Sequence, residues 1–350
     1  MMGFAAAARI LDAAIDAGVS PGAVAEVGSR SEALWRHATG RLTYDADSPA
    51  AAADTVFDLA SLTKVVATTT LAMRHVDEGL TPLDLPVADA LRTWRGSDRE
   101  MVTVRDLLEH ASGLTAHLAF YHDHVGRAEF EPAIGRLPLE YAPRTASIYS
   151  DLGFILLGFI LTDRHPSGMG LSAQFDEVAA RRGWGDMRFH PPSEWRPRTA
   201  PTEQDPWRGR TLIGEVHDEN AWALEGAAGH AGLFGSAGAV GRFARDILTG
   251  FGGDGPLASA ATFRTFRTRS TVPGSSRAVG WDTMLPTSSC GTRLSADSIG
   301  HTGFTGTSLW IDPAADRYVV LLTNRVHPSR SNQGILALRP AFHDAVMATD

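Results

Sequence analysis

Ser61-Leu62-Thr63-Lys64 is the stretch that decides the fold, and it directly follows the strand-like run Val56-Phe57-Asp58-Leu59. Residues three apart lie on one face of a helix, so the Lys64 amine would lie one turn from the Ser61 hydroxyl. A lysine in this position can serve as the base for a serine nucleophile if burial lowers the lysine pKa. The four residues therefore indicate a candidate catalytic pair.

The residues after Lys64 favour this interpretation. The run from Val65 to Met73 carries no charged side chain, which predicts a long helix buried nearly all round with Lys64 at its start. A capping serine followed by a solvated lysine would give the same four letters. Two further signatures downstream, Tyr149-Ser150-Asp151 and His301-Thr302-Gly303, argue against that simpler interpretation.

In serine β-lactamases and penicillin-binding proteins, Ser-x-x-Lys is followed along the chain by Tyr-x-Asn and then by Lys-Thr-Gly. This chain resembles that family, and within it the class C type, over nearly its whole length. Two positions depart from the usual pattern, since Asp151 stands where Asn is usual and His301 where Lys is usual. Further matching stretches are Pro21-Gly22-Ala23, Phe57-Asp58-Leu59-Ala60, Val104 to Leu114, Gly232 to Ser236 and His301 to Gly306.

The resemblance implies a serine hydrolase that forms an acyl-enzyme on Ser61. Lys64 would accept the serine proton, and Tyr149 would relay it to the leaving group. The backbone N–H groups of Ser61 and Phe304 would form the oxyanion hole. The residues implied to border the substrate are Asp151, His301, Thr302 and Gly303, the last because a residue without Cβ lets the strand approach the substrate carbonyl.

The two departures bear on the substrate. A histidine at position 301 is mostly neutral near pH 7, and Asp151 adds a negative charge, so both changes weaken the binding of an anion. The sequence therefore predicts hydrolysis of an ester or amide, with neutral substrates preferred over carboxylate-bearing β-lactams. D,D-peptidase, muropeptide amidase and β-lactamase activity stay open within the same family. A non-catalytic binding relative is the alternative of another class, and it would have no physical need for a buried lysine.

Composition sets further bounds. The chain has 350 residues, of which 43% are hydrophobic and 21% charged, as expected of a globular protein with one catalytic domain. A net charge of −8 provides no basic stripe for nucleic acid. Cys290 is the single cysteine, which excludes a disulfide within the chain. No metal or organic cofactor is implied, and the expected partner is a small ester, amide or peptidoglycan-derived substrate.

The N-terminal stretch from Met1 to Asp12 has no basic start and reads as an amphipathic helix rather than a signal peptide. No run reaches the roughly 18 apolar residues of a membrane helix. The sequence therefore predicts a cytoplasmic protein without a membrane span, although a trimmed secreted form would look the same. The oligomeric state stays open.

The periodicity predicts an α+β fold. Alternating runs at 23–28 and 33–40 form one hairpin, and runs at 308–312 and 317–323 form another. Hairpins at both ends predict one antiparallel β-sheet flanked by helices near 4–17 and 332–348, with an inserted, mainly helical lobe. The predicted single domain spans 1–350, with the sheet lobe at roughly 1–60 and 270–350 and helices and loops at roughly 61–269. The segment 188–214 is predicted to be a long ordered loop.

Three other patterns in the sequence allow a functional and a structural interpretation. Gly18-Val19-Ser20-Pro21-Gly22 matches the nucleophile elbow of α/β-hydrolases, but that elbow needs a strand before the serine and a helix after it, the reverse of the order here. His117, His122, Asp123 and His124 suggest a polar loop rather than a zinc site, because their spacing fits no helix face. The segment 214–221 fits either a turn in which Asp218 caps a helix or a substrate contact. Together with 201–203 and 229–232, it resembles peptidoglycan-directed members of the family.

Overall fold

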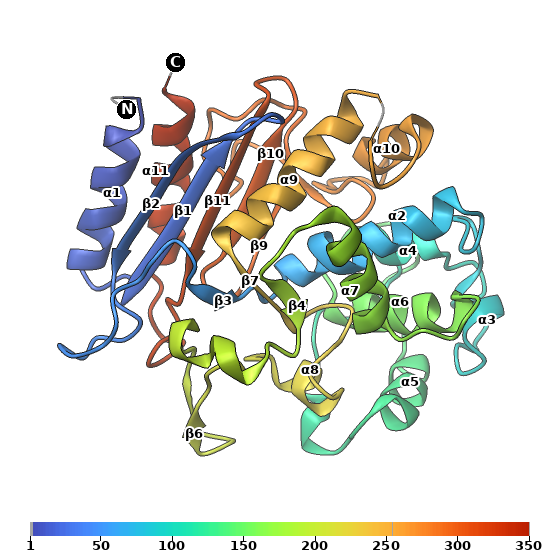
Figure 1. Cartoon of the computed structure of the whole chain (residues 1–350). Helices are drawn as coiled ribbons and strands as arrows, with labels where there is room; N and C mark the ends of the chain where they lie inside the picture. Colours follow the sequence, from blue (N-terminus) through green and yellow to red (C-terminus); the bar gives the residue numbers. More distant parts are fainter. Residues whose placement is uncertain (1–2, 254, 350) are drawn as a thin grey trace.

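Strands from both ends of the chain form one antiparallel sheet in the computed structural model, which describes residues 3–253 and 255–349 (Figure 1). Within these residues the strand order is β2-β1-β11-β10-β9-β8. The bounds are β1 (Gly22–Gly28), β2 (Ala33–Gly40), β8 (Asp282–Thr283), β9 (Ile299–Thr302), β10 (Ser308–Asp312) and β11 (Arg317–Thr323). Both predicted hairpins and the α+β class are confirmed.

The central pairing joins the two ends of the chain. Strand β1 pairs with β11 in a register that sets Ala25 opposite Leu321, and with β2 on its other side. Every residue of β1 is buried, because helices cover both faces of the sheet. Side chains alternate across the strand, so that Ala25 packs toward one helical layer and Val24 toward the other.

The helices near the two termini share one face of the sheet. Helices α1 (Ala5–Asp16) and α11 (Ile335–Met347) lie side by side on it, and α9 (Ala237–Phe251) covers the opposite face (Figure 1). Apolar residues of α1 and α11 form a cluster with β1 and β11. The two helices predicted near the chain ends are therefore confirmed.

The middle of the chain is mainly helical and packs beside the sheet (Figure 1). Its helices are α2 (Thr70–Asp77), α3 (Val87–Ala90), α4 (Val104–Leu108), α5 (Arg127–Gly135), α6 (Asp151–Arg164), α7 (Leu171–Arg182), α8 (Glu219–Ala223) and α10 (Ala260–Arg267). In the described part of the chain, no helix is long and apolar enough to cross a membrane. The domain and lobe boundaries stay a prediction.

The strand-like run 56–59 is confirmed as β3 (Val56–Asp58), but the other short strands of this region were missed. A second sheet has the order β3, β7 (Leu233–Ser236) and β4 (Met187–Phe189), and β5 (Gln204–Asp205) pairs with β6 (Arg210–Thr211). The segment 188–214, predicted as a loop, thus contains strand residues and a 3₁₀ helix (Ser193–Arg198). Strands of two or three residues show no readable alternation, and partners far away in the sequence hold them in place.

The apolar run after Ser61 is not one regular α-helix. Residues Lys64–Thr69 form a π-helical turn, and α2 begins only at Thr70. The Thr70 hydroxyl donates to the carbonyl of Val65, five residues earlier, at 3.3 Å, which matches the wider turn. Every residue from Lys64 to Met73 is buried, so the predicted burial of this segment is confirmed.

Candidate active site

The turn before Ser61 is held by a buried carboxylate. Asp58, at the end of β3, accepts hydrogen bonds from the backbone N–H of Ala60 at 2.8 Å and of His217 at 2.7 Å. Ala60 has a φ of 47°, a left-handed conformation that is unfavourable for a residue with a Cβ. The Asp58 bond helps to hold this conformation, and Ser61 then faces a cavity of about 600 Å³.

Lys64 lies where the sequence predicted it, with its amine 3.0 Å from the Ser61 hydroxyl and its side chain fully buried. The same amine lies 2.7 Å from the Asp151 carboxylate and donates to the carbonyl of His230 at 3.0 Å. These three acceptors match the three N–H bonds of an ammonium group.

The charge of Lys64 differs from the sequence expectation. Burial acts to lower the pKa of Lys64, but Asp151 and Tyr149 outweigh it, and the net pKa is raised. Burial acts to raise the pKa of Asp151, but Lys64 holds it well below its usual range. The expectation of a lowered lysine pKa is therefore wrong, because position 151 carries a carboxylate that forms an ion pair with the amine.

Tyr149 completes the group around the serine. Its hydroxyl donates to the Ser61 oxygen at 2.8 Å, and burial raises the pKa of the phenol. Ser150 caps α6 by accepting the N–H of Gly153 at 3.4 Å, which fixes Tyr149 just before the helix. The ring of His110 lies 4.8 Å from the Tyr149 ring, a contact that the sequence analysis missed.

The two residues predicted to supply the oxyanion hole, Ser61 and Phe304, both lie at the cavity. Neither the N–H of Ser61 nor that of Phe304 donates a hydrogen bond to any other described residue, and both residues line the cavity. Gly303 has no room for a side chain, since a Cβ would lie 2.1 Å from the Thr307 hydroxyl and 2.6 Å from the Leu59 carbonyl. The turn at Gly303 therefore packs closely against Leu59 and Ala60, just before the nucleophile. The role of the Ser61 and Phe304 N–H groups as an oxyanion hole stays a prediction.

His301 and Thr302 line the same cavity. Burial, reinforced by the nearby positive charges of Arg277 and Lys64, lowers the pKa of His301 to about 3. Its Nδ1 lies 2.7 Å from the Thr302 carbonyl, which fits a neutral imidazole that donates from this nitrogen. The predicted neutrality of His301 is confirmed.

Arg277 is a cation in the cleft that the sequence analysis missed. It lines the cavity, and its guanidinium lies 5.5 Å from the centre of the Tyr149 ring. Its one acidic neighbour among the described residues is Asp282, at 3.7 Å, and 16% of the Arg277 side chain is exposed. Arg277 adds a permanent positive charge to the cleft, which the expectation of weak anion binding did not take into account. A loop arginine far from every motif gives no signal in the sequence.

The segment 214–221 caps a helix, the first of the two roles that the sequence left open, and the substrate contact stays a prediction. Asp218 accepts the N–H of Ala221 at 2.7 Å and so caps α8. It also pairs with His230 at 2.8 Å and lines the cavity together with His217 and Glu219. The segment is thus a helix cap and a wall of the cleft.

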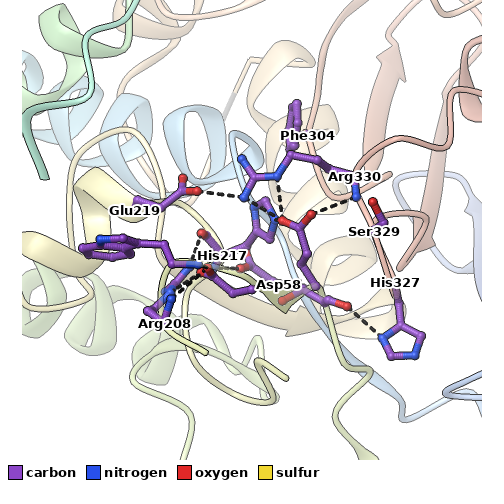
Figure 2. Close-up of polar contacts among 12 residues, drawn as sticks. Asp58, Arg208, His217, Glu219, Phe304, His327, Ser329 and Arg330 are labelled. Carbon is purple, nitrogen blue, oxygen red and sulfur yellow. Dashed lines mark hydrogen bonds and ion pairs between the residues drawn. The ribbon is translucent and has the colours of Figure 1, made fainter. Parts of the chain in front are cut away.

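A polar network supports this wall (Figure 2). The buried Glu203 carboxylate lies 3.0 Å from His217 Nε2 and 2.6 Å from Arg330 Nε, and Arg330 also bonds Glu219 at 2.7 Å. Burial acts to raise the pKa of Glu203, but the hydrogen bonds from His217 and Arg330 lower it to about 2. The ring of His217 stacks on that of Phe304 at 5.7 Å. The network thereby supports the residue beside the nucleophile.

Of the weaker candidates, Ser20 lies outside the cavity and His117 lies in it. Ser20 is fully buried, and its hydroxyl donates to the Gly22 carbonyl at 2.9 Å. His117 lies in the cleft, 3.6 Å from Asp151. Among residues 3–253 and 255–349, no group of three His, Cys, Asp or Glu side chains is arranged to hold a metal ion.

Comparisons with known proteins agree with this geometry. The family model described as beta-lactamase matches residues 7–340. A protein of Escherichia coli K12, provisionally named D-alanyl-D-alanine carboxypeptidase, is 33% identical over 307 residues, which are 78% of this chain and 70% of that protein.

Solved structures share the fold. A penicillin-binding protein homologue from Caulobacter crescentus has a TM-score of 0.75 at 20% identity, covering 99% of this chain and 98% of that one. EstCE1, described as a hydrolase with promiscuous acyltransferase activity, has a TM-score of 0.75 at 22% identity, covering 96% of this chain and 97% of its own. At such low identity these two likenesses support the fold alone.

Proposed function

The chain belongs to the β-lactamase family of serine hydrolases, and we propose that it uses Ser61 to cleave peptides that end in a free carboxylate. The observation that carries this substrate class is Arg277, a cation in the cleft beside Tyr149. The name of the Escherichia coli relative points to the same class of substrate. The proposed activity is that of a D,D-carboxypeptidase.

The reaction begins with attack of the Ser61 oxygen on the scissile carbonyl carbon. The negative charge that develops on the carbonyl oxygen is stabilised by the N–H groups of Ser61 and Phe304. Collapse of the intermediate breaks the bond to the leaving amine, which takes a proton from Tyr149. Water then releases the acyl group from Ser61 and regenerates the hydroxyl.

The Ser61 hydroxyl needs a group that can accept its proton. In the resting site both candidate acceptors, Lys64 and Tyr149, are already protonated. Lys64 is an ammonium beside Asp151, and Tyr149 is a phenol, so neither can accept a proton in this state. We infer that the active form has lost one proton from the coupled Lys64 and Tyr149 pair. The Ser61 proton then enters this pair, and the leaving group takes it up from Tyr149.

The variant Asp151→Asn tests whether Asp151 controls the protonation of Lys64 and Tyr149. Asp151 raises the pKa of both Lys64 and Tyr149. Loss of its charge should lower both values, so the rising limb of the plot of kcat/KM against pH should move to lower pH. The matched control is Asp163→Asn, which breaks an ion pair with Arg127 outside the cleft and should leave the profile unchanged. If the pH dependence of kcat/KM in Asp151→Asn equals that of wild type, Asp151 does not set the pKa of the group that accepts the serine proton.

The position of Arg277 beside Tyr149 supports a role on the leaving-group side of the cleft. Tyr149 must lie beside the leaving group in order to protonate it, and both His301 and Arg277 flank the Tyr149 ring, at 5.7 and 5.5 Å. With His301 neutral, Arg277 is the cation on this side that can bind a carboxylate on the leaving amino acid.

Arg277→Met is the experiment that tests the proposed substrate. A charge-assisted hydrogen bond is worth about 1.5 to 3 kcal/mol, so kcat/KM for a peptide ending in D-alanyl-D-alanine should fall about 10-fold to 100-fold. For the same peptide with a C-terminal amide, the variant should stay within about 3-fold of wild type. Arg269→Met is the control, since Arg269 lies outside the cavity and bonds the carbonyls of Met284 and Ala296. Equal losses on both peptides would refute the assignment.

A further inference from the structure

Two arginines that also line the cavity hydrogen-bond the backbone carbonyls of the turn that carries the Phe304 N–H. Arg339, in α11, donates from one nitrogen to the carbonyls of Gly303 at 2.6 Å and Thr307 at 2.9 Å. Arg325, which follows β11, donates to the carbonyl of Phe304 at 2.9 Å. Guanidinium groups thus bond three backbone carbonyls of the turn.

Both arginines are buried, at 6% and 4% exposure, and neither forms an ion pair with a carboxylate of the described residues. The Nε atom of Arg339 is buried without any hydrogen-bond partner in this part of the chain. Burial, with Arg325 nearby, lowers the pKa of Arg339 to about 10, so the group stays charged at neutral pH. Buried charges without an ion-pair partner carry a desolvation cost that a purely structural clamp would not require.

The peptide group between Gly303 and Phe304 connects Arg339 to the site. The C=O and N–H of a trans peptide point in opposite directions. Here the C=O points at Arg339, and the N–H belongs to Phe304, which lines the cavity beside Ser61. A hydrogen bond to the carbonyl polarises the amide and makes its N–H a stronger donor. A positive charge at the carbonyl end of the peptide also favours negative charge at its N–H end.

We propose that Arg339, assisted by Arg325, is a positioning residue of the oxyanion hole. Its guanidinium fixes and polarises the Gly303–Phe304 peptide, so that the Phe304 N–H is aimed at the oxygen on which charge develops. The proposal rests on acyl-enzyme chemistry at Ser61. Because that charge develops in the transition state, Arg339 contributes to turnover rather than to substrate binding.

The test compares Arg339→Met and Arg339→Lys with wild type. Removal of one oxyanion donor from an enzyme typically costs about 10²-fold to 10³-fold in kcat, and here the donor stays but is weakened. We expect Arg339→Met to lower kcat about 10-fold to 100-fold with little change in KM, and Arg339→Lys to recover part of the loss. The inhibition constant of an alkyl boronic acid, whose adduct with Ser61 is tetrahedral, should rise by the same factor as kcat/KM falls.

Arg99→Met is the matched control. Arg99 is equally buried, at 4% exposure, and donates to the carbonyls of Gly135 and Leu137, but it pairs with Asp98 and lies outside the cavity. Its loss should lower Tm and leave both kcat and boronate inhibition of the folded protein unchanged. If Arg339→Met does not fold, Arg339→Lys decides by the same two readouts.

Wild-type kcat and wild-type boronate inhibition in the folded Arg339 variants would overturn the proposal. A rise in KM alone would overturn it as well, since it would place Arg339 in ground-state binding. Either result would leave hydrolysis at Ser61 intact. A wild-type protein with no hydrolase activity would instead contradict the proposed function.

Discussion

Replacement of Ser61 by alanine is expected to lower kcat/KM by about 10⁴-fold or more, because the acyl-enzyme cannot form without its oxygen. Lys64→Ala should cost about as much, since the amine lies 3.0 Å from that oxygen and belongs to the group that takes its proton. Substitutions of groups that act as one unit do not have additive effects. The kcat/KM of the double variant should therefore be only slightly lower than that of either single variant. Steady-state hydrolysis of a D-alanyl peptide by all three variants measures this.

Ser20→Ala is the control for these variants. Ser20 is buried and bonds the Gly22 carbonyl and Asn324, outside the cavity. Its loss should cost about 1 kcal/mol of stability and leave turnover unchanged. Full activity in Ser61→Ala, or effects of Ser61→Ala and Lys64→Ala that multiply in the double variant, would contradict the assignment of a single catalytic unit.

Lys64→Arg is expected to lose about 10³-fold or more of kcat/KM at every pH. The coupled pair must give up one proton before it can accept that of Ser61, and an arginine stays charged throughout the accessible range. The longer guanidinium also does not fit the space of a fully buried amine that already has three partners. The measurement is kcat/KM from pH 5 to 10, with Tm as the check on folding.

A Lys64→Arg variant that is active at high pH would reassign the base. Tyr149 would then accept the serine proton alone, with the positive charge at position 64 lowering its pKa. Comparison with Tyr149→Phe would separate the two cases, because Tyr149→Phe removes the only other group that bonds the Ser61 hydroxyl in the described part of the chain.

Much of the site could be predicted from the sequence, because three short motifs fix the chemistry. Ser61, Lys64 and Tyr149 were expected together, and the structure places them within 3.0 Å of one hydroxyl oxygen. The sheet built from both chain ends was predictable too, because its long strands alternate and its hairpins are short. The motifs thus identified the residues that lie next to the reacting atoms.

The charge state of the site could not be predicted with the same success. A buried lysine alone suggests a lowered pKa, but the ion pair with Asp151 reverses the shift. Arg277 and Arg339 come from a loop and from a helix that carry no motif, and only the folded chain brings them to the cleft. Charges that act across the fold leave no local pattern in the sequence.

The π-helical turn after Ser61 and the two- and three-residue strands around 187–211 were missed for a related reason. Pairing with distant segments holds these strands, as when β4 and β3 both pair with β7. Local propensity says little about elements of this length. These elements nevertheless position Asp58 and the wall of the cleft that includes His217.

The most direct test of the central claim is mass spectrometry of acid-quenched protein during turnover of a peptide ending in D-alanyl-D-alanine. The account predicts that the proteolytic fragment containing Ser61 gains the mass of the substrate acyl group, that is, the acyl portion without the terminal D-alanine. Ser61→Ala should show no such gain. Turnover without an adduct on any residue, or an adduct on a residue other than Ser61, would contradict the account.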